Sequence, residues 1–413
     1  WSRLPGFPQS IASSSLMGVP SAGDDGGGTE VAVTLQVGPT IGQGTSGEVA
    51  KLLNSIDGGS YVLKRVPLDR SAGDAQRSTF VALEEVRLHR LVSSGCDSIV
   101  RYAFSNLAGS ELLVCMEACD LCLWDALAAS PGGEHSSFAV GGLASCAAPS
   151  GREKLREQRV ALHMELAGAV RHCHELRVLH RDVNPWNIFL CRREGSGPPW
   201  AAKLGDFGLA LRMPDGVDLL EGNEAHGAAP LDESALGSLY SAPELGKVYG
   251  FPADIFSLGM TLLALWSAAS CDDEDTLICV VEKSKQAAVE GIAPELGDSA
   301  HSESMIRRML HPSPSARPAM VEVCEGVAGA ERFLEEERHA RQDDIQKCFQ
   351  SVLGQSTRLV QWAQLSKVIA ACGLPESTLG ALEAVWGRDV DGVLDYTLFL
   401  DWVFRQDSIK LAA

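Results

Sequence analysis

Apolar and polar residues alternate in several short runs within the first third of the chain. Residues 78–92 (STFVALEEVRLHRLV) instead repeat apolar residues at helical spacing. Five strand-like runs, two of them after this helical stretch, are residues 31–38, 47–54, 60–68, 99–105 and 111–118. Five strands with one inserted helix predict a small α+β lobe.

The pattern becomes helical from residue 121 onward. Residues 153–176 place apolar side chains on one helical face, and residues 255–269 form the longest apolar run. That run is too short to span a membrane, so we expect a buried helix. Residues 130–151 interrupt the pattern as an expected flexible insertion, and the acidic, Gly-rich residues 212–236 suit a mobile functional loop.

The two ends of the chain differ from this middle part. Residues 1–32 are rich in Ser, Gly and Pro, a composition that buries too little apolar surface to offset the entropy of ordering. We expect this segment to be disordered. Residues 334–413 are again helical in pattern and predict a separate small domain.

Charge and cysteine content exclude several classes of protein. The 413 residues carry a formal net charge of −19, which argues against a general nucleic-acid or anionic-membrane binder. The 12 cysteines are scattered rather than dense, so we expect reduced thiols and an intracellular protein, cytoplasmic or nuclear. The C-x-x-C of Cys119 and Cys122 lacks a second pair, which makes it a weak zinc motif.

A glycine-rich motif follows the first strand-like run. Gly42, Gly44 and Gly47 stand in G-x-G-x-x-G order, and glycines let backbone N–H groups approach phosphate oxygens. The strand–loop–strand context disfavours a dinucleotide-binding turn, whereas a hairpin without ligand stays open. Lys64 lies in an apolar strand and needs an anionic partner if it is buried. A solvent-facing lysine on an edge strand is the alternative.

Taken together, the motifs resemble those of eukaryotic protein kinases of the serine/threonine type. The resemblance covers about residues 35–330 and implies a bilobal fold, with an N-lobe over 33–119 and a C-lobe over 120–333. Its motifs occur in the family's order, namely the Gly-rich loop with Val49, the strand with Lys64, HRDVNPWN (180–187), DFG (206–208) and SAPE (241–244). The activation segment would then be 206–244.

The resemblance assigns roles to the nucleotide-binding residues. Lys64 would hold the phosphates of ATP and pair with a glutamate of the following helix. The helix resembles that of the Wee family, which favours Glu85, and the adjacent Glu84 stays an alternative. Glu117 to Cys119 would form the hinge that binds the adenine edge, behind Met116. Apolar residues would sandwich the adenine ring, namely Ile41, Val49, Val62 and Phe189.

The same resemblance assigns the catalytic chemistry. Asp182 would accept the proton of the substrate hydroxyl, while Asn187 and Asp206 would hold Mg²⁺ with hard oxygen ligands. Pro185 and the GSLYSAPE stretch, with Ser238 in place of the usual Thr, favour transfer to Ser or Thr of protein substrates.

Asn184 is the main departure from the family pattern. Serine/threonine kinases usually carry a lysine at this position, and an amide has no charge to offer the transferred phosphoryl group. An active kinase with slow turnover is therefore one interpretation. A kinase-like scaffold that binds nucleotide and transfers little is the alternative.

Structural pairings are also implied by the resemblance. Glu244 would pair with Arg317, and Asp254 would brace the catalytic loop from the buried helix beneath it.

The C-terminal segment resembles the second half of an EF-hand. Gly392 falls at the sharp turn, and three aspartates take ligand-like positions, namely Asp389, Asp391 and Asp395. Gly387 and Leu398 stand where the first ligand and the bidentate Glu are expected, and neither side chain offers an oxygen. We therefore expect a helical EF-hand-like pair that docks a partner without Ca²⁺. A working Ca²⁺ site is the alternative.

Overall fold

Two compact units make up the chain in a computed structural model. One unit comprises residues 1–193 with 200–327, and the other comprises 194–199 with 328–413. The structure describes residues 35–44, 47–54, 59–68, 75–128, 149–193, 198–222, 231, 233–271, 273–292, 300–326, 329, 359–361, 366–367 and 393–395. The expected disordered segment 1–32 lies outside these residues, as does most of the expected insertion 130–151.

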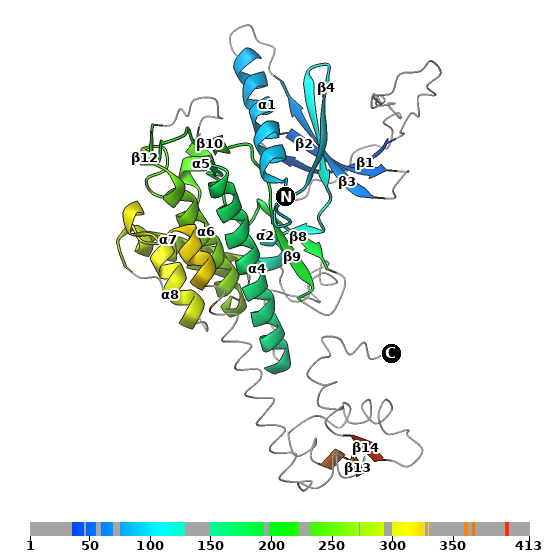
Figure 1. Cartoon of the computed structure of the whole chain (residues 1–413), viewed down its shortest axis with the longest axis vertical. Coiled ribbons are helices and arrows are strands. Elements are labelled where there is room, and N and C mark those ends of the chain that lie inside the picture. Colours follow the sequence, from blue (N-terminus) through cyan, green and yellow to red (C-terminus); the bar gives the residue numbers. More distant parts are fainter. Residues whose placement is uncertain are drawn as a thin grey trace. The chain divides into compact units, whose positions relative to one another are not determined.

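An antiparallel sheet of five strands, in the order β1-β2-β3-β5-β4, forms the first lobe. Helix α1 (Ala75–Val92) is inserted between β3 and β4 and packs on one face of the sheet (Figure 1). Apolar clusters lie on both faces, because successive strand residues point to opposite sides. The strands are β1 (Leu35–Gly44), β2 (Gly47–Asn54), β3 (Ser60–Pro67), β4 (Tyr102–Ala108) and β5 (Glu111–Glu117).

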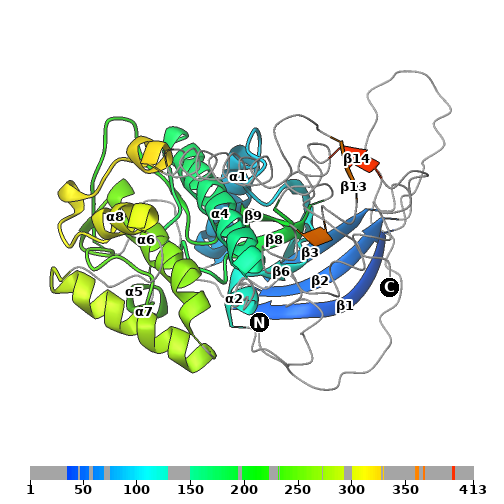
Figure 2. The ribbon, with the colours of Figure 1, turned by 90° about the horizontal axis from the view of Figure 1, so that it is seen from below.

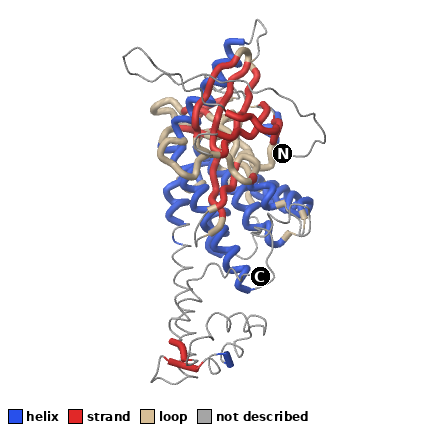
Figure 3. Tube along the Cα trace, turned by 90° about the vertical axis from the view of Figure 1, so that its right-hand side faces the viewer, coloured by secondary structure: helices blue, strands red, loops and turns tan. Residues whose placement is uncertain are grey.

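Helices dominate the second lobe, whose centre is α6 (Phe251–Ser267). Every residue of α6 from Ala253 to Ser267 is buried, which explains its continuous apolar sequence. Figure 2 shows α6 among the other helices, and Figure 3 shows that most of the helices of this unit gather at one end and most of its strands at the other. The other helices are α2 (Leu123–Leu127), α4 (Pro149–Glu175), α5 (Glu233–Gly237), α7 (Glu274–Val289) and α8 (Ala300–Met309), with short 3₁₀ turns η1 (Ala268–Ser270) and η2 (Pro314–Ala316).

Short strands in the second lobe position the loops between the lobes. A three-stranded sheet runs in the order β6-β8-β9, and two-stranded sheets join β7 to β10 and β11 to β12. These strands are β6 (Leu121–Cys122), β7 (Val178–Leu179), β8 (Ile188–Arg192), β9 (Trp200–Leu204), β10 (Leu211–Arg212), β11 (Leu220–Glu221) and β12 (Val248–Tyr249). In the described part of the chain, no helix is long and apolar enough to cross a lipid bilayer.

Element boundaries differ from the sequence expectation at three points. Strand β1 runs through Gly42 and Gly44 because the glycine-rich motif is itself the end of a β-hairpin with β2. Strand β4 begins at Tyr102, and Ile99 instead forms an isolated bridge to Leu204. Helix α4 begins at Pro149, so the last residues assigned to the insertion are helical; proline is well tolerated in the first turn of a helix.

The second unit is described only in part. Strands β13 (Leu359–Gln361) and β14 (Val393–Asp395) pair antiparallel, with Val360 opposite Leu394. Most of the expected helical, EF-hand-like domain lies outside the described residues, including Gly387, Asp389, Asp391 and Leu398.

Candidate active site

Lys64 contacts one carboxylate from each lobe, and the contact with Asp206 joins the two lobes. Its Nζ lies 2.7 Å from Glu85 Oε1 on α1 and 3.1 Å from Asp206 Oδ1, which follows β9. The lysine side chain is only 9% exposed. Burial alone would lower the pKa of Lys64, but the charges of Asp206 and Glu85 outweigh it and hold the pKa above its ordinary value. Lys64 is therefore a fixed positive charge at the junction of the lobes.

The structure distinguishes the two adjacent glutamates of α1. Glu85 faces Lys64, whereas Glu84 Oε2 lies 3.6 Å from the exposed guanidinium of Arg87 on the same helix. Successive helical residues point about 100° apart. The rotation of α1 against the sheet therefore decides which carboxylate reaches the lysine.

Strand register gathers the nucleotide-contact candidates on one face of the sheet. Val49 lies opposite Lys64, and Val62 lies opposite Met116. Residues directly opposite each other, and residues two apart along a strand, share a face. Val49, Val62, Lys64 and Met116 thus line the same side. Ile41, also expected there, is 45% exposed on β1.

Gly47 is required by the hairpin that holds this face. Its φ is +131°, and a Cβ added to it would lie 2.0 Å from the carbonyl oxygen of Arg65 on β3. A side chain at this position would therefore collide with the neighbouring backbone. Gly44 pairs directly with Gly47 at the end of the hairpin.

A row of aromatic rings runs from β4 to the catalytic loop. Tyr102 meets His89 edge-on, His89 stacks on Phe207 at 5.2 Å, and Phe207 meets His180 at 4.9 Å. Burial lowers the pKa of His89, whose Nε2 donates to the Val100 carbonyl at 2.6 Å, so the ring packs as a neutral group. Sequence reasoning missed this row, although His89 lies one helical turn after Glu85.

The Asp182 carboxylate is held by two amides of its own loop. Asn184 Nδ2 donates to Oδ1 at 2.7 Å, and Asn187 Nδ2 donates to Oδ2 at 2.6 Å. Burial raises the pKa of Asp182 above its ordinary value, and the two amide donors oppose that rise by stabilising the carboxylate. The Asp182 carboxylate is thus oriented through both of its oxygens.

Asn184 acts within the loop rather than projecting from it. The side chain is 7% exposed, and its Oδ1 accepts from the backbone N–H of Trp186 at 3.0 Å and of Asn187 at 3.2 Å. Its Nδ2 reaches both the carboxylate and the carbonyl of Asp182. One amide therefore caps the loop turn and orients the Asp182 carboxylate at once, which its two-sided hydrogen-bonding capacity allows.

Asp254 supports the loop from the buried helix α6. Its Oδ2 accepts from the backbone N–H of His180 and its Oδ1 from that of Arg181, both at 2.8 Å. His174 Nε2 lies 3.0 Å from Oδ2. Burial would raise the pKa of Asp254, but these donors hold it below its ordinary value. Arg181 has φ +66°, a left-handed conformation that the two oxygens of Asp254 help to maintain.

The residues expected to hold nucleotide and metal present suitable atoms. Among the described residues, the hydrogen bonds of Asp206 all involve Oδ1, and the Asn187 amide nitrogen is directed at Asp182. Asp206 Oδ2 and the Asn187 oxygen are thus available, and hard oxygens suit Mg²⁺. In the same part of the chain, the backbone N–H of Cys119 has no partner, so it can meet an adenine edge. Phe189 packs close to Gly205, where an added Cβ would lie 2.9 Å from its ring.

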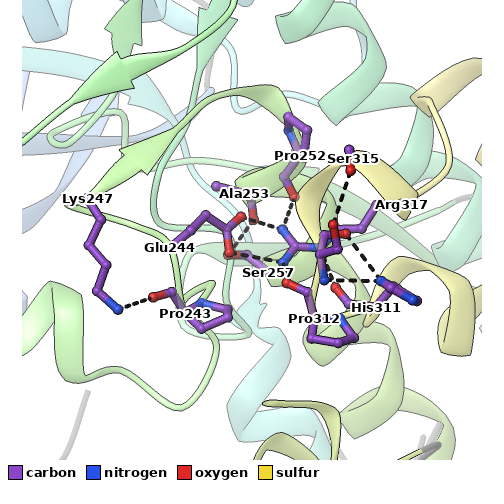
Figure 4. Close-up of polar contacts among 11 residues, drawn as sticks. Pro243, Glu244, Lys247, Pro252, Ala253, Ser257, His311, Pro312, Ser315 and Arg317 are labelled. Carbon is purple, nitrogen blue, oxygen red and sulfur yellow. Dashed lines mark hydrogen bonds and ion pairs between the residues drawn. The ribbon is translucent and has the colours of Figure 1, made fainter. Parts of the chain in front are cut away.

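The far end of the activation segment is fixed by a buried ion pair. Arg317 donates to both oxygens of Glu244 and to the backbone carbonyls of Pro252, His311 and Pro312 (Figure 4). Its side chain is fully buried, so the Glu244 carboxylate must balance its charge while the carbonyl oxygens accept its remaining N–H groups. The pairing expected from the resemblance is present.

Comparisons with known proteins agree with this geometry. The model of the protein kinase domain matches residues 35–327. Calcium-dependent protein kinase 22 of Oryza sativa subsp. japonica is 27% identical over 304 residues, which cover 70% of this chain and 45% of that protein. Wee1-like protein kinase of the same organism is 27% identical over 284 residues, or 68% of this chain and 45% of that protein.

A third relative is the serine/threonine-protein kinase Nek5 of Mus musculus. It is 24% identical over 282 residues, or 68% of this chain and 38% of that protein. The match spans less than half the length of each of these three relatives. Because the family model covers most of the chain, the conclusion about the family is plain: this chain belongs to the protein kinase domain family.

Proposed function

We propose that this chain is an ATP- and Mg²⁺-dependent protein kinase that transfers the γ-phosphoryl group to Ser or Thr hydroxyls of protein substrates. The observation that carries the proposal is the contact of Lys64 with both Glu85 and Asp206, which unites the lobes around one buried charge. Kinase domains use ATP with Mg²⁺, and the metal ion would neutralise charge on the phosphates. Calcium-dependent protein kinase 22 and Wee1-like protein kinase are both named protein kinases, and Nek5 is named a serine/threonine-protein kinase.

In this proposal each residue of the site has one task. Lys64 binds phosphate oxygens from the N-lobe side, and Glu85 keeps it in place. Asp182 orients the substrate hydroxyl and accepts its proton, while Asn187 and Asp206 offer oxygens to the metal ion. The backbone of Glu117 and Cys119 binds the adenine edge, and Val49, Val62 and Phe189 pack against the ring. Because phosphoryl transfer depends mostly on positioning and charge, these tasks suffice.

We also infer that Asn184 is a positioning residue and not a defect. Its hydrogen bonds to Asp182 supply the orientation of the base, so the loss of a lysine charge lowers the rate without abolishing transfer. The alternative is the kinase-like scaffold that binds nucleotide and transfers little.

A transfer assay separates the two functions. The full chain is incubated with Mg²⁺ and γ-labelled ATP on a generic Ser/Thr substrate, beside Asp182→Asn and Asn184→Lys. Transfer by the unchanged chain well above that of Asp182→Asn supports the kinase. Transfer no greater than that of Asp182→Asn, with nucleotide binding intact, establishes the scaffold instead. A large gain in transfer by Asn184→Lys shows that the residue at position 184 limits the rate.

We further propose that residues 334–413 form an EF-hand-like pair that docks a protein partner and does not depend on Ca²⁺. Support comes from β14, which begins immediately after Gly392 and pairs with β13 in the segment expected to supply the partner hand. Leu398 offers no carboxylate for Ca²⁺. Calorimetric titration of the full chain with Ca²⁺ tests this proposal, and micromolar binding contradicts it.

A further inference from the structure

In the described part of the chain, three residues other than glycine have a left-handed backbone, and two of them belong to the motifs of the site. Arg181 has φ +66° and precedes Asp182, and Asp206, with φ +56°, is proposed above to hold Mg²⁺. The third is Arg177, with φ +61°, which lies outside every motif. Such conformations cost free energy and are maintained mainly at functional sites. The strain at Arg177 therefore points to a role in the same site.

Both the backbone and the side chain of Arg177 hold the segment that follows β10. Its carbonyl oxygen accepts from the backbone N–H of Met213 at 2.7 Å. Its Nη2 donates to the carbonyl oxygens of Pro214, at 2.7 Å, and of Val217, and Val217 N closes the turn by donating to the Pro214 oxygen at 3.1 Å. The guanidinium carbon also lies 5.4 Å from the centre of the Phe251 ring. One side chain thus fixes both ends of the turn after β10.

The ion pair of Arg177 with Asp218 adds little to this arrangement. Nη1 lies 3.2 Å from Asp218 Oδ1, but the aspartate side chain is 81% exposed, so water and salt screen the attraction. The carbonyl oxygens of Pro214 and Val217, and not the carboxylate, are therefore the main partners of the guanidinium.

A second arginine holds the other side of β10. Arg181 Nε donates to the carbonyl oxygen of Leu209 at 2.6 Å, two residues before β10 begins. β10 pairs with β7 over only two residues, and so short a ladder is weak by itself. Arg177 directly precedes β7 and Arg181 follows it closely. The two arginines thus stand on either side of β7 and fasten both ends of β10 to it.

This ladder connects the two carboxylates of the site. β7 leads into the loop that carries Asp182, and β10 comes from the segment that carries Asp206. His180 adds a contact between the same two segments, because its Nε2 lies 3.1 Å from the Gly205 carbonyl oxygen. The way β10 lies on β7 therefore sets the position of Asp206 relative to Asp182.

We propose that Arg177 is a positioning residue that fastens β10 to β7 and thereby keeps Asp206 where it can hold Mg²⁺ beside Asp182. This inference rests on the proposed function, in which Asp206 offers an oxygen to the metal ion. Without the guanidinium, β10 is fastened by a side chain only at the Arg181 end. Asp206 then spends less time in the position that binds the metal ion, and Mg²⁺-nucleotide binds more weakly in proportion.

Three variants of the full chain test the role of this guanidinium. Arg177→Asn is the main variant, because asparagine tolerates a left-handed backbone and its side chain is too short for the two carbonyl oxygens. Arg177→Lys keeps the charge but replaces the planar fork with a single nitrogen. It carries the test if circular dichroism shows that Arg177→Asn does not fold. Arg212→Ala removes an exposed arginine of β10 itself and is the matched control.

Two measurements are made on each protein. Hydrogen exchange without nucleotide or metal, read by mass spectrometry of peptides covering residues 209–222, reports how firmly β10 is held. Calorimetry with ADP, once in excess Mg²⁺ and once in EDTA, separates the part of nucleotide binding that depends on the metal ion from the part that does not.

The expected changes are specific to the metal-dependent part. In Arg177→Asn, residues 209–218 should exchange faster, and ADP affinity in Mg²⁺ should fall by about tenfold, as for the loss of a group that orients a metal ligand. Its ADP affinity in EDTA should equal that of the unchanged chain. Arg177→Lys should show the same changes to a smaller extent, and Arg212→Ala should match the unchanged chain throughout.

Unchanged exchange in Arg177→Asn, or unchanged ADP affinity in Mg²⁺, overturns the proposal. An equal loss of ADP affinity in Mg²⁺ and in EDTA also overturns it, because such a loss reports general loosening and not a displaced metal ligand. An unchanged chain whose ADP binding does not respond to Mg²⁺ refutes the proposed function instead, whereas the exchange rates still show whether Arg177 holds β10.

Discussion

Replacing Asn184 with alanine removes one of the two amides that hold the Asp182 carboxylate. The lost hydrogen bond is the 2.7 Å contact from Nδ2 to Oδ1, and the N–H groups of Trp186 and Asn187 lose their acceptor as well. A hydrogen bond to a charged group contributes about 1.5–3 kcal/mol. If all of it acts in the transition state, kcat falls by about 10- to 150-fold.

The same substitution should also change the dependence of rate on pH. Burial already raises the pKa of Asp182, and Asn184 is one of the donors that oppose this rise. Without that donor the pKa rises further. Because a catalytic base acts only when it is deprotonated, the acid limb of the kcat profile should move to higher pH.

Steady-state kinetics across a pH series measure both effects. Asn184→Asp is the matched variant, since it keeps an acceptor for the two backbone N–H groups but places a second carboxylate beside Asp182. Its acid limb should move further than that of Asn184→Ala. Asn106→Ala, at an exposed position of β4, is the control and should change neither quantity. Full kcat with an unmoved acid limb in Asn184→Ala would refute the role assigned to this amide.

Three further outcomes follow from the buried charges. Lys64→Met should lower transfer by about 10²–10³-fold through loss of a fixed charge, measured by kcat with circular dichroism as the control for folding. Glu244→Ala leaves Arg317 buried without its carboxylate and should cost about 3–5 kcal/mol of unfolding free energy, measured by urea denaturation. Unchanged urea midpoints would contradict this. The pKa of Asp254 is depressed, so its stabilisation is present above its unfolded pKa and is lost as pH falls through the folded value. Asp254→Asn should therefore be less stable at neutral pH and lose less on acidification, and a parallel loss in both proteins would count against this account.

Sequence reasoning located the motifs because each is local. The spacings of the glycines, the lysine and the carboxylates can be recognised in the sequence without knowing how the chain packs. The inserted helix follows from apolar periodicity. The choice between Glu84 and Glu85 needed the structure, because the rotation of α1 against the sheet decides which of the two carboxylates faces Lys64. The same holds for Asn184, whose amide can point outward or back to Asp182 with no change in sequence.

Contacts between residues far apart in the sequence could not be predicted for a similar reason. Leu121 pairs with Leu190 because β6 and β8 are neighbours in one sheet, and nothing near either residue in the sequence signals the other. The C-x-x-C sequence was only a weak zinc motif, and the structure uses its second cysteine, Cys122, as a helix cap. The aromatic row through His89 and Phe207 likewise depends on how α1 packs over the catalytic loop.

The two halves of the site are held by contacts between residues of very different separation in the sequence. Asn184 lies two residues from Asp182, whereas Lys64 and Asp206 are 142 residues apart and come from opposite lobes. Local hydrogen bonds persist through a hinge motion, and interlobe contacts do not. If the lobes swing apart, the Asp182 carboxylate keeps its orientation while the charge of Lys64 moves away from Asp206. Opening and closing of the lobes would then switch turnover on and off without rebuilding the catalytic loop each time.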